Sequence, residues 1–291
     1  MNMIEIIGLN KSYTKSEFKL KDVNFTLPTG EIMGFIGENG AGKTTTLNCI
    51  LGTLIKDSGN IKLFGIDATD ENSYLRDDIG VVFDVESFGT RMTPKKIANV
   101  MRTVYNNWDD DLYQDYLTSF KLPYKARIAT FSRGMTMKLA LAVALSHHPK
   151  LLILDEATGG LDPVARDEIL DIILDFVNDG KKSVLFSSHI TSDLEKIADS
   201  ITFIHDGEII LSKAKDELTH EYGILRCPKS KFGDLDKHDI IAYKEREFQV
   251  DVLVHNKIVV AKKHKEIVMD KATIEEIMLL IIRGESHNEE K

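Results

Sequence analysis

The chain has 291 residues and carries 37 basic against 46 acidic side chains, which gives a formal net charge of −9. This length fits one large domain, or one domain with an appendage. Because nucleic acids bind clustered lysine and arginine, the net acidity argues against nucleic acid as the main partner.

Two further classes of protein are disfavoured by the composition. The two cysteines, Cys49 and Cys227, lie far apart and have no metal-ligand spacing, so we expect no disulfide framework, as in a reducing cytoplasm. The N-terminus lacks the apolar core of a signal peptide, and no stretch approaches the ~20 apolar residues of a membrane span. Any membrane role is therefore expected to act through a partner.

The first third of the chain predicts strands around a glycine-rich loop. Short apolar or alternating segments indicate strands at residues 20–27, 31–36, 59–64 and 79–83. A helix is expected at residues 44–51, directly after the loop.

Residues of about 84–147 change to a helical pattern and predict an insert. Thr93-Pro94 combines an N-cap with proline at the first helical position, and apolar residues follow at helical spacing. Two more helices are expected at about 110–120 and 132–146.

After the insert, strands and helices alternate. The apolar run at 151–154 is typical of a buried parallel strand. Further strands are expected at 183–186, 201–204 and 209–211, and helices at 162–178 and 191–198. This alternation predicts an α/β fold with a mostly parallel sheet covered on both faces.

The tail from Gly223 differs, and we expect an accessory α+β subdomain at 223–291 after a main domain at 1–222. Short strands are expected on both sides of an Asn256-Lys257 turn. A last helix is predicted to begin at Thr273, with Glu276 completing a capping box, and to end at Gly284.

The strongest chemical signal is the segment GENGAGKT at residues 37–44, between an expected strand and an expected helix. It matches the phosphate-binding loop pattern, in which glycines let successive backbone N–H groups point at phosphate oxygens. Lys43 would reach the β- and γ-phosphates, and Thr44 would bind Mg²⁺.

A second signal follows the apolar strand at 151–154, which delivers Asp155 and Glu156 at its carboxyl end. Asp155 is expected to hold Mg²⁺, and Glu156 to orient or deprotonate the attacking water.

Three more motifs complete a pattern: Ser132-Arg133-Gly134-Met135 at a helix start, Gly160-Leu161-Asp162, and Ser188-His189 after a strand. In this order and spacing the chain resembles the ATP-binding cassette (ABC) ATPases over about residues 3–215. The resemblance implies a cassette with a mixed sheet, an antiparallel β subdomain and the helical insert.

The resemblance also implies roles for single residues. Tyr13 would stack on adenine, His189 would bind the γ-phosphate, and Asp162 would sit in a loop that crosses between two subunits. Ser132 and Gly134 would contact the γ-phosphate held by the other subunit, although Ser132 and Asp162 also fit as plain helix caps. The expected ATP-binding residues are Tyr13, Gly37, Asn39, Gly40, Ala41, Gly42, Lys43, Thr44, Thr45, Ser132, Gly134 and Asp162.

Some positions depart from the family pattern. Arg133 and Met135 replace a glycine and a glutamine of the signature motif. Asp84 stands where the family usually has a glutamine beside Mg²⁺, and we expect it to bind the metal directly or through water. Ala157 replaces the usual proline after the catalytic glutamate.

The leading hypothesis is the ATP-hydrolysing subunit of a bacterial ABC transporter. Two such subunits would close around two Mg-ATP and drive a separate integral membrane subunit at the cytoplasmic face of the membrane. The variant signature resembles exporters of peptides and antimicrobials. Alternatives are a soluble ABC ATPase acting on ribosomes or DNA, and a subunit that binds ATP but barely hydrolyses it. Phe88, Met92 and Trp108 are candidate contacts for the membrane subunit or ordinary core residues.

Overall fold

The computed structural model describes residues 1–14, 17–83 and 88–285. The chain divides into two compact units, Met1–Ser212 and Lys213–Lys291. The functional division expected from the sequence, at residue 222, stays a prediction. Within the described part of the chain, no helix combines the length and apolarity that a membrane crossing requires.

The first unit is built on a six-stranded sheet in the order β10-β9-β3-β8-β7-β6. The pairs β3–β8, β3–β9, β7–β8 and β6–β7 are parallel, as the alternating pattern predicts. The central strands β3, β7 and β8 are buried along their whole length, which explains the nearly continuous apolar sequences of β3 and β7. The strands are β3 (Ile32–Ile36), β6 (Ile79–Val82), β7 (Leu151–Asp155), β8 (Ser183–Ser188), β9 (Ser200–His205) and β10 (Glu208–Ala214).

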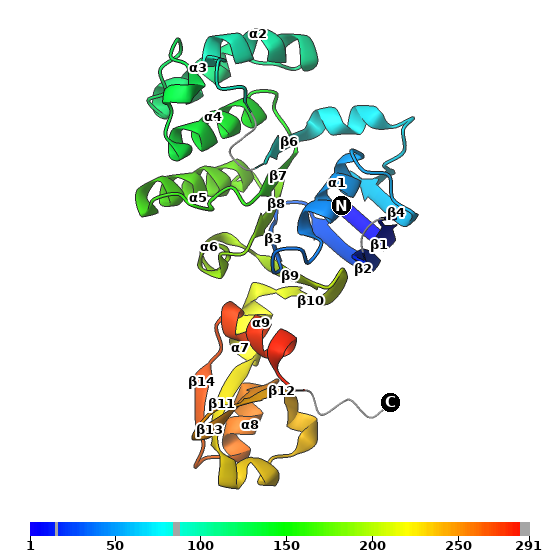
Figure 1. Ribbon diagram of the computed structural model, residues 1–291, viewed down its shortest axis with the longest axis vertical. Helices are drawn as coiled ribbons and strands as arrows, with labels where there is room; N and C mark the ends of the chain where they lie inside the picture. The colour runs from blue at the N-terminus through cyan, green and yellow to red at the C-terminus, as the bar shows by residue number, and fades with distance from the viewer. Residues whose placement is uncertain (15–16, 84–87, 286–291) are drawn as a thin grey trace. The chain divides into compact units, whose positions relative to one another are not determined.

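A second, four-stranded antiparallel sheet belongs to the same unit and has the order β2-β1-β4-β5. Its buried side chains share one hydrophobic core with the first helix, α1 (Lys43–Leu51), and with strands β3 and β7. In Figure 1 this sheet and α1 lie on one side of the large sheet, and α4, α5 and α6 lie on the other. The strands are β1 (Asn2–Ser12), β2 (Lys19–Pro28), β4 (Ser58–Leu63) and β5 (Ile66–Asp67).

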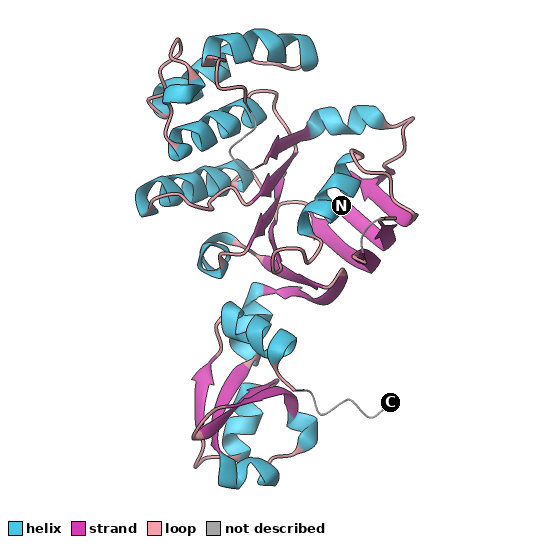
Figure 2. Cartoon of the chain, viewed as in Figure 1, coloured by secondary structure: helices cyan, strands magenta, loops and turns pink. Residues whose placement is uncertain are grey.

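The helical insert has its own core, centred on the fully buried Tyr113. Phe88, Met92 and Trp108 pack against this core and are partly buried, as ordinary core packing requires. Figure 2 shows the helices of the first unit in cyan. Besides α1, the α-helices are α2 (Pro94–Val104), α3 (Asp110–Ser119), α4 (Arg133–Leu145), α5 (Pro163–Val177) and α6 (Thr191–Ile197).

Polar residues set the start of several helices. The Thr93 side chain accepts a hydrogen bond from the backbone of Lys96 at α2, and Pro94 follows at the first helical position. Ser132 caps α4 and Asp162 caps α5 in the same way. Each cap satisfies a backbone N–H that has no partner inside its helix, so these helices begin where the sequence predicts.

The described part of the second unit, up to residue 285, is an antiparallel sheet in the order β12-β13-β11-β14, with the α-helices α7, α8 and α9. Arg226 ties its parts together, because its guanidinium pairs with Asp251, Asp270 and Glu276. The elements are α7 (Lys215–Glu221), β11 (Gly223–Pro228), β12 (Ile240–Glu245), β13 (Gln249–Val254), α8 (Lys257–Lys263), β14 (Val268–Lys271) and α9 (Ile274–Arg283).

One expected strand in this unit is wrong and one helix is confirmed. Residues after Asn256 form helix α8 rather than a strand. Asn256 adopts a left-handed conformation with φ of 56°, and only Val260 of α8 is buried, at 1% exposure. A short pair of apolar residues such as Val259 and Val260 fits a helix as well as a strand, so these valines alone did not distinguish the two. The capping box of Thr273 and Glu276 starts α9 as predicted.

Candidate functional site

The glycine-rich loop leaves the buried strand β3 and enters α1. Gly42 is the N-cap of α1 with φ of 116°, and within the described residues no side chain caps this helix end. A Cβ at Gly42 would lie only 2.6 Å from Leu20 Cδ2, so both conformation and packing demand glycine here. The first N–H groups of α1 are therefore left for an anion, as in a phosphate-binding loop.

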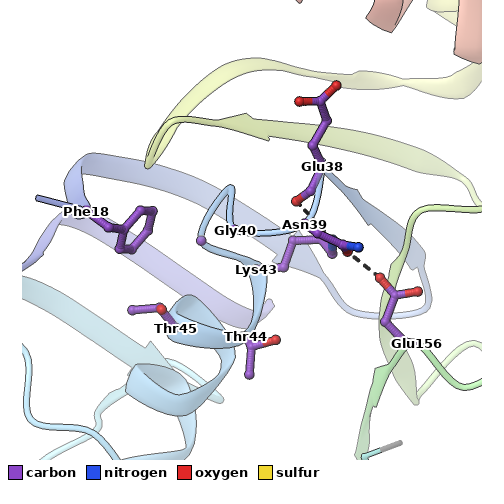
Figure 3. Close-up of a pocket in the computed structure, with 9 residues that line it drawn as sticks. Phe18, Glu38, Asn39, Gly40, Lys43, Thr44, Thr45 and Glu156 are labelled. Atoms are coloured by element: carbon purple, nitrogen blue, oxygen red, sulfur yellow. Dashed lines mark hydrogen bonds and ion pairs between the residues drawn. The ribbon is translucent and has the colours of Figure 1, made fainter. Parts of the chain in front are cut away.

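A cavity of about 330 Å³ opens over this loop. Figure 3 shows Phe18 on one side and Glu156 on the other, with the loop residues between them. Gly37 and Ala41 belong to the loop but do not line the cavity, because Gly37 packs on the backbone of Ile204 and Ala41 is buried. The lining residues are Phe18, Glu38, Asn39, Gly40, Gly42, Lys43, Thr44, Thr45 and Glu156.

Lys43 is buried at the base of the cavity, with 6% of its surface exposed. Its Nζ donates to the carbonyl oxygen of Gly37 at 2.8 Å and lies 3.3 Å from Glu156 Oε1 (Figure 3). A buried ammonium needs such partners, because removal from water disfavours the charge. The fold thus joins the start of α1 to the end of β7.

Asp155 is the last residue of β7 and is buried. Its Oδ2 accepts a hydrogen bond from Thr44 Oγ1 at 2.9 Å, whereas its buried Oδ1 has no partner among the described residues. An unpaired buried carboxylate oxygen is costly, and Mg²⁺ binds hydroxyl and carboxylate oxygens. The paired hydroxyl and the open oxygen therefore fit a divalent cation at this position. Asp84, the other expected metal ligand, lies outside the described residues.

Glu156 follows Asp155 with φ of 55°, a conformation that is strained for a residue with a side chain. Its Oε2 lies 2.6 Å from His189 Nδ1, while Oε1 faces Lys43. This carboxylate is therefore held between two nitrogen groups that come from two other segments. The structure brings together Lys43, Thr44, Asp155, Glu156 and His189, as the motifs predict.

The remaining expected residues lie apart from this cluster. Ser132 is exposed, and its Oγ accepts from the backbone N–H of Met135. Asp162 is exposed and accepts from Val164 and Ala165, so it caps α5. Neither of these residues nor Gly134 lines the cavity. In a single chain, both side chains thus serve as helix caps.

Two aromatic residues flank the other side of the loop. The Tyr13 hydroxyl lies 3.4 Å from Thr45 Oγ1, and the Tyr13 and Phe18 rings are 6.5 Å apart. Phe18 lines the cavity, whereas Tyr13 does not. Phe18 and Glu38 are not among the residues predicted from the sequence, because neither stands at a fixed position of the loop pattern. The proximity of Phe18 to a strand start was the only signal available.

Comparison with known proteins agrees with a nucleotide-binding site at this loop. The family model described as ABC transporter matches residues 20–159. The bacitracin transport ATP-binding protein of Bacillus licheniformis is 30% identical over 257 residues, covering 87% of this chain and 82% of that protein. The lantibiotic transport ATP-binding protein of Streptococcus pyogenes is 36% identical over 219 residues, covering 74% and 92%.

A solved structure agrees with these relatives. The structure of an ATP-binding subunit of an ABC transporter is 27% identical, with a TM-score of 0.66, and the match covers 74% of this chain and 91% of that one. The fold, the phosphate-binding loop and the relatives agree: the chain belongs to the ABC transporter family, as one of its ATP-binding ATPases.

Proposed function

We propose that this ATPase powers a bacterial exporter of peptides or antimicrobials, acting on a separate integral membrane subunit at the cytoplasmic face of the membrane. The names of the bacitracin and lantibiotic relatives support an exporter. They also favour a transporter over a soluble ATPase that acts on ribosomes or DNA. The observation that carries the catalytic part is the Glu156 carboxylate, held between Lys43 and His189 beside the phosphate-binding loop.

The loop and α1 would bind the triphosphate of ATP. Backbone N–H groups of the loop and of the start of α1 would face the anion, and Lys43 would supply a buried positive charge. Mg²⁺, held by Thr44 and Asp155 and by the expected ligand Asp84, would supply positive charge that offsets the phosphate oxygens. Tyr13 is proposed to stack on the adenine ring, with Phe18 beside it.

Glu156 would act as the general base on the attacking water. Lys43 contacts Glu156 Oε1 and the loop carbonyl oxygens of Gly37 and Glu38. When Lys43 turns to a phosphate instead, Oε1 is released to accept a proton, and His189 keeps Oε2 in place. The intact set of Lys43, Glu156 and His189 supports hydrolysis over a subunit that only binds ATP.

Ser132, Gly134 and Asp162 would complete the site of a second copy. Ser132 and Asp162 are exposed, and none of the three reaches the cavity of their own chain. Paired head-to-tail, two copies would bury these residues around two Mg-ATP. ATP binding would then be coupled to closure of the pair.

The experiment is a comparison of Glu156→Gln with the wild type. We expect turnover to fall by at least about 100-fold while ATP binding persists, because the amide cannot accept the proton. Light scattering on Glu156→Gln should show one chain without Mg-ATP and two with it. Glu71→Gln, an exposed glutamate remote from the cavity, is the matched control. Equal turnover in Glu156→Gln would refute Glu156 as the base.

A further inference from the structure

Arg133 occupies a signature position where the family pattern has glycine, and its guanidinium lies beside Gly160. A Cβ built on Gly160 would lie 3.2 Å from Cζ, 3.3 Å from Nε and 3.3 Å from Nη1 of Arg133. Three nearly equal distances mean that the guanidinium plane faces the position that a Cβ of residue 160 would take. Gly160 has φ of 68°, a backbone conformation that favours glycine, and the absence of a Cβ leaves room for the exposed Arg133 side chain.

Gly160 belongs to the short loop between Glu156 and the start of α5. Glu156 enters this loop with φ of 55°, and its carbonyl oxygen accepts from the Gly159 N–H at 3.1 Å. The Leu161 N–H donates to Thr158 at 3.3 Å. Two consecutive turns therefore connect the backbone of Glu156 to the backbone of Asp162, which caps α5.

The two helices next to this loop are packed together at their N-terminal ends. A Cβ on Gly134 of α4 would lie 3.1 Å from the Cβ of Ala165 in α5. Farther along, Lys138 of α4 forms an ion pair with Glu168 of α5. Arg133 is the first residue of α4, so its backbone belongs to a helix that packs on α5. Its side chain extends over the loop that enters α5.

We propose that Arg133 is a positioning residue, whose planar guanidinium holds the Glu156–Asp162 loop and thereby sets the Glu156 carboxylate against Lys43 and His189. The inference rests on the proposed role of Glu156 as the base. It gives the departure from the usual signature a function, because glycine at position 133 has no side chain to cover Gly160. Lysine would retain the charge but not the flat surface.

The first test is steady-state ATP hydrolysis by the full chain. Arg133→Gly should lower kcat by about tenfold or more and leave KM for ATP within about twofold, because the phosphate-binding loop is untouched. The kcat of Arg133→Lys should be as low as that of Arg133→Gly. Arg133→Gln, which has a planar amide, should retain a higher kcat. Arg127→Gly, an exposed arginine of the same insert, is the control and should match wild type. Wild-type kcat in Arg133→Gly would overturn the proposal.

The contact itself is tested by a double-mutant cycle with Gly160→Ala. The added methyl displaces the guanidinium, so Gly160→Ala should lower kcat by a factor at least about three times larger in the wild type than in Arg133→Gly. The strain of alanine at a positive φ is present in both backgrounds and cancels. Equal factors in the two backgrounds would show that Arg133 and Gly160 act independently.

Hydrogen exchange of the chain without nucleotide separates this inference from the proposed function. The amides of Gly159 and Leu161 should exchange about tenfold faster in Arg133→Gly than in Arg127→Gly. Unchanged exchange would show that Arg133 does not hold the Glu156–Asp162 loop, whatever the activity of Glu156→Gln. Conversely, faster exchange in Arg133→Gly together with full turnover in Glu156→Gln would support the role of Arg133 in holding the loop and reject Glu156 as the base.

Discussion

Glu156 and His189 are joined by a short contact, with 2.6 Å between the carboxylate Oε2 and the imidazole Nδ1. They directly follow the last residues of β7 and β8, neighbouring parallel strands whose register pairs Asp155 with Ser187. Because Nδ1 is turned to the carboxylate, the second ring nitrogen, Nε2, is the one left for a phosphate or a water. The contact thus orients both side chains for the reaction.

His189→Ala should therefore lower kcat by about 100-fold, because Glu156 loses the group that holds Oε2, while KM for ATP changes little. Steady-state hydrolysis over a range of ATP concentrations measures both constants. His148→Ala is the control, since His148 also pairs with a carboxylate, Asp109, and its contact lies away from the cavity. The role fails if both variants lose activity equally.

Asp155→Asn should raise the Mg²⁺ concentration needed for half-maximal hydrolysis by about tenfold or more. The amide oxygen can still accept from Thr44, but the negative charge and the second carboxylate oxygen are lost to the metal. Titration with Mg²⁺ after removal of metal by EDTA measures the effect. An unchanged Mg²⁺ requirement would show that Asp155 does not bind the metal.

Tyr13 and Phe18 make different predictions about adenine. Loss of a stacking ring costs about 1–3 kcal/mol per base, which corresponds to about 5–150-fold in ATP affinity. We expect this loss in Tyr13→Ala and not in Tyr13→Phe, whose ring is kept. Phe18→Ala serves as the comparison, because Phe18 lines the cavity. Nucleotide titration followed by fluorescence will show which ring stacks; a loss confined to Phe18→Ala would transfer the role.

Asp57 predicts a pH-dependent contribution to stability. Hydrogen bonds from Lys11 and Ser12 lower the pKa of Asp57 to about 2, from an ordinary value of 3.8. The unfolded chain therefore takes up the proton first, so this stabilisation is present above pH 3.8 and is lost as the pH falls toward 2. Asp57→Asn should lower the Tm at pH 7, and the difference from wild type should shrink below pH 4 and vanish near pH 2. A constant difference across this range would contradict the assignment.

Much of the fold follows from local sequence. The caps at Thr93, Ser132 and Asp162 start their helices as predicted, because a short polar side chain satisfies backbone N–H groups only two or three residues away. The strand and helix alternation also predicted the parallel sheet. The strand predicted after the Asn256-Lys257 turn was wrong, because the two apolar residues Val259 and Val260 fit a strand and a helix equally.

The phosphate-binding loop follows from local sequence, since its residues are contiguous and Gly40 and Gly42 have a positive φ, which favours glycine. The meeting of Lys43, Glu156 and His189 depends on the order of the strands, because β8 lies between β3 and β7 and aligns the carboxyl ends of all three. The same holds for Arg133 and Gly160, whose contact depends on the packing of α4 against α5. Contacts between distant segments depend on strand order and helix packing, which no local pattern encodes.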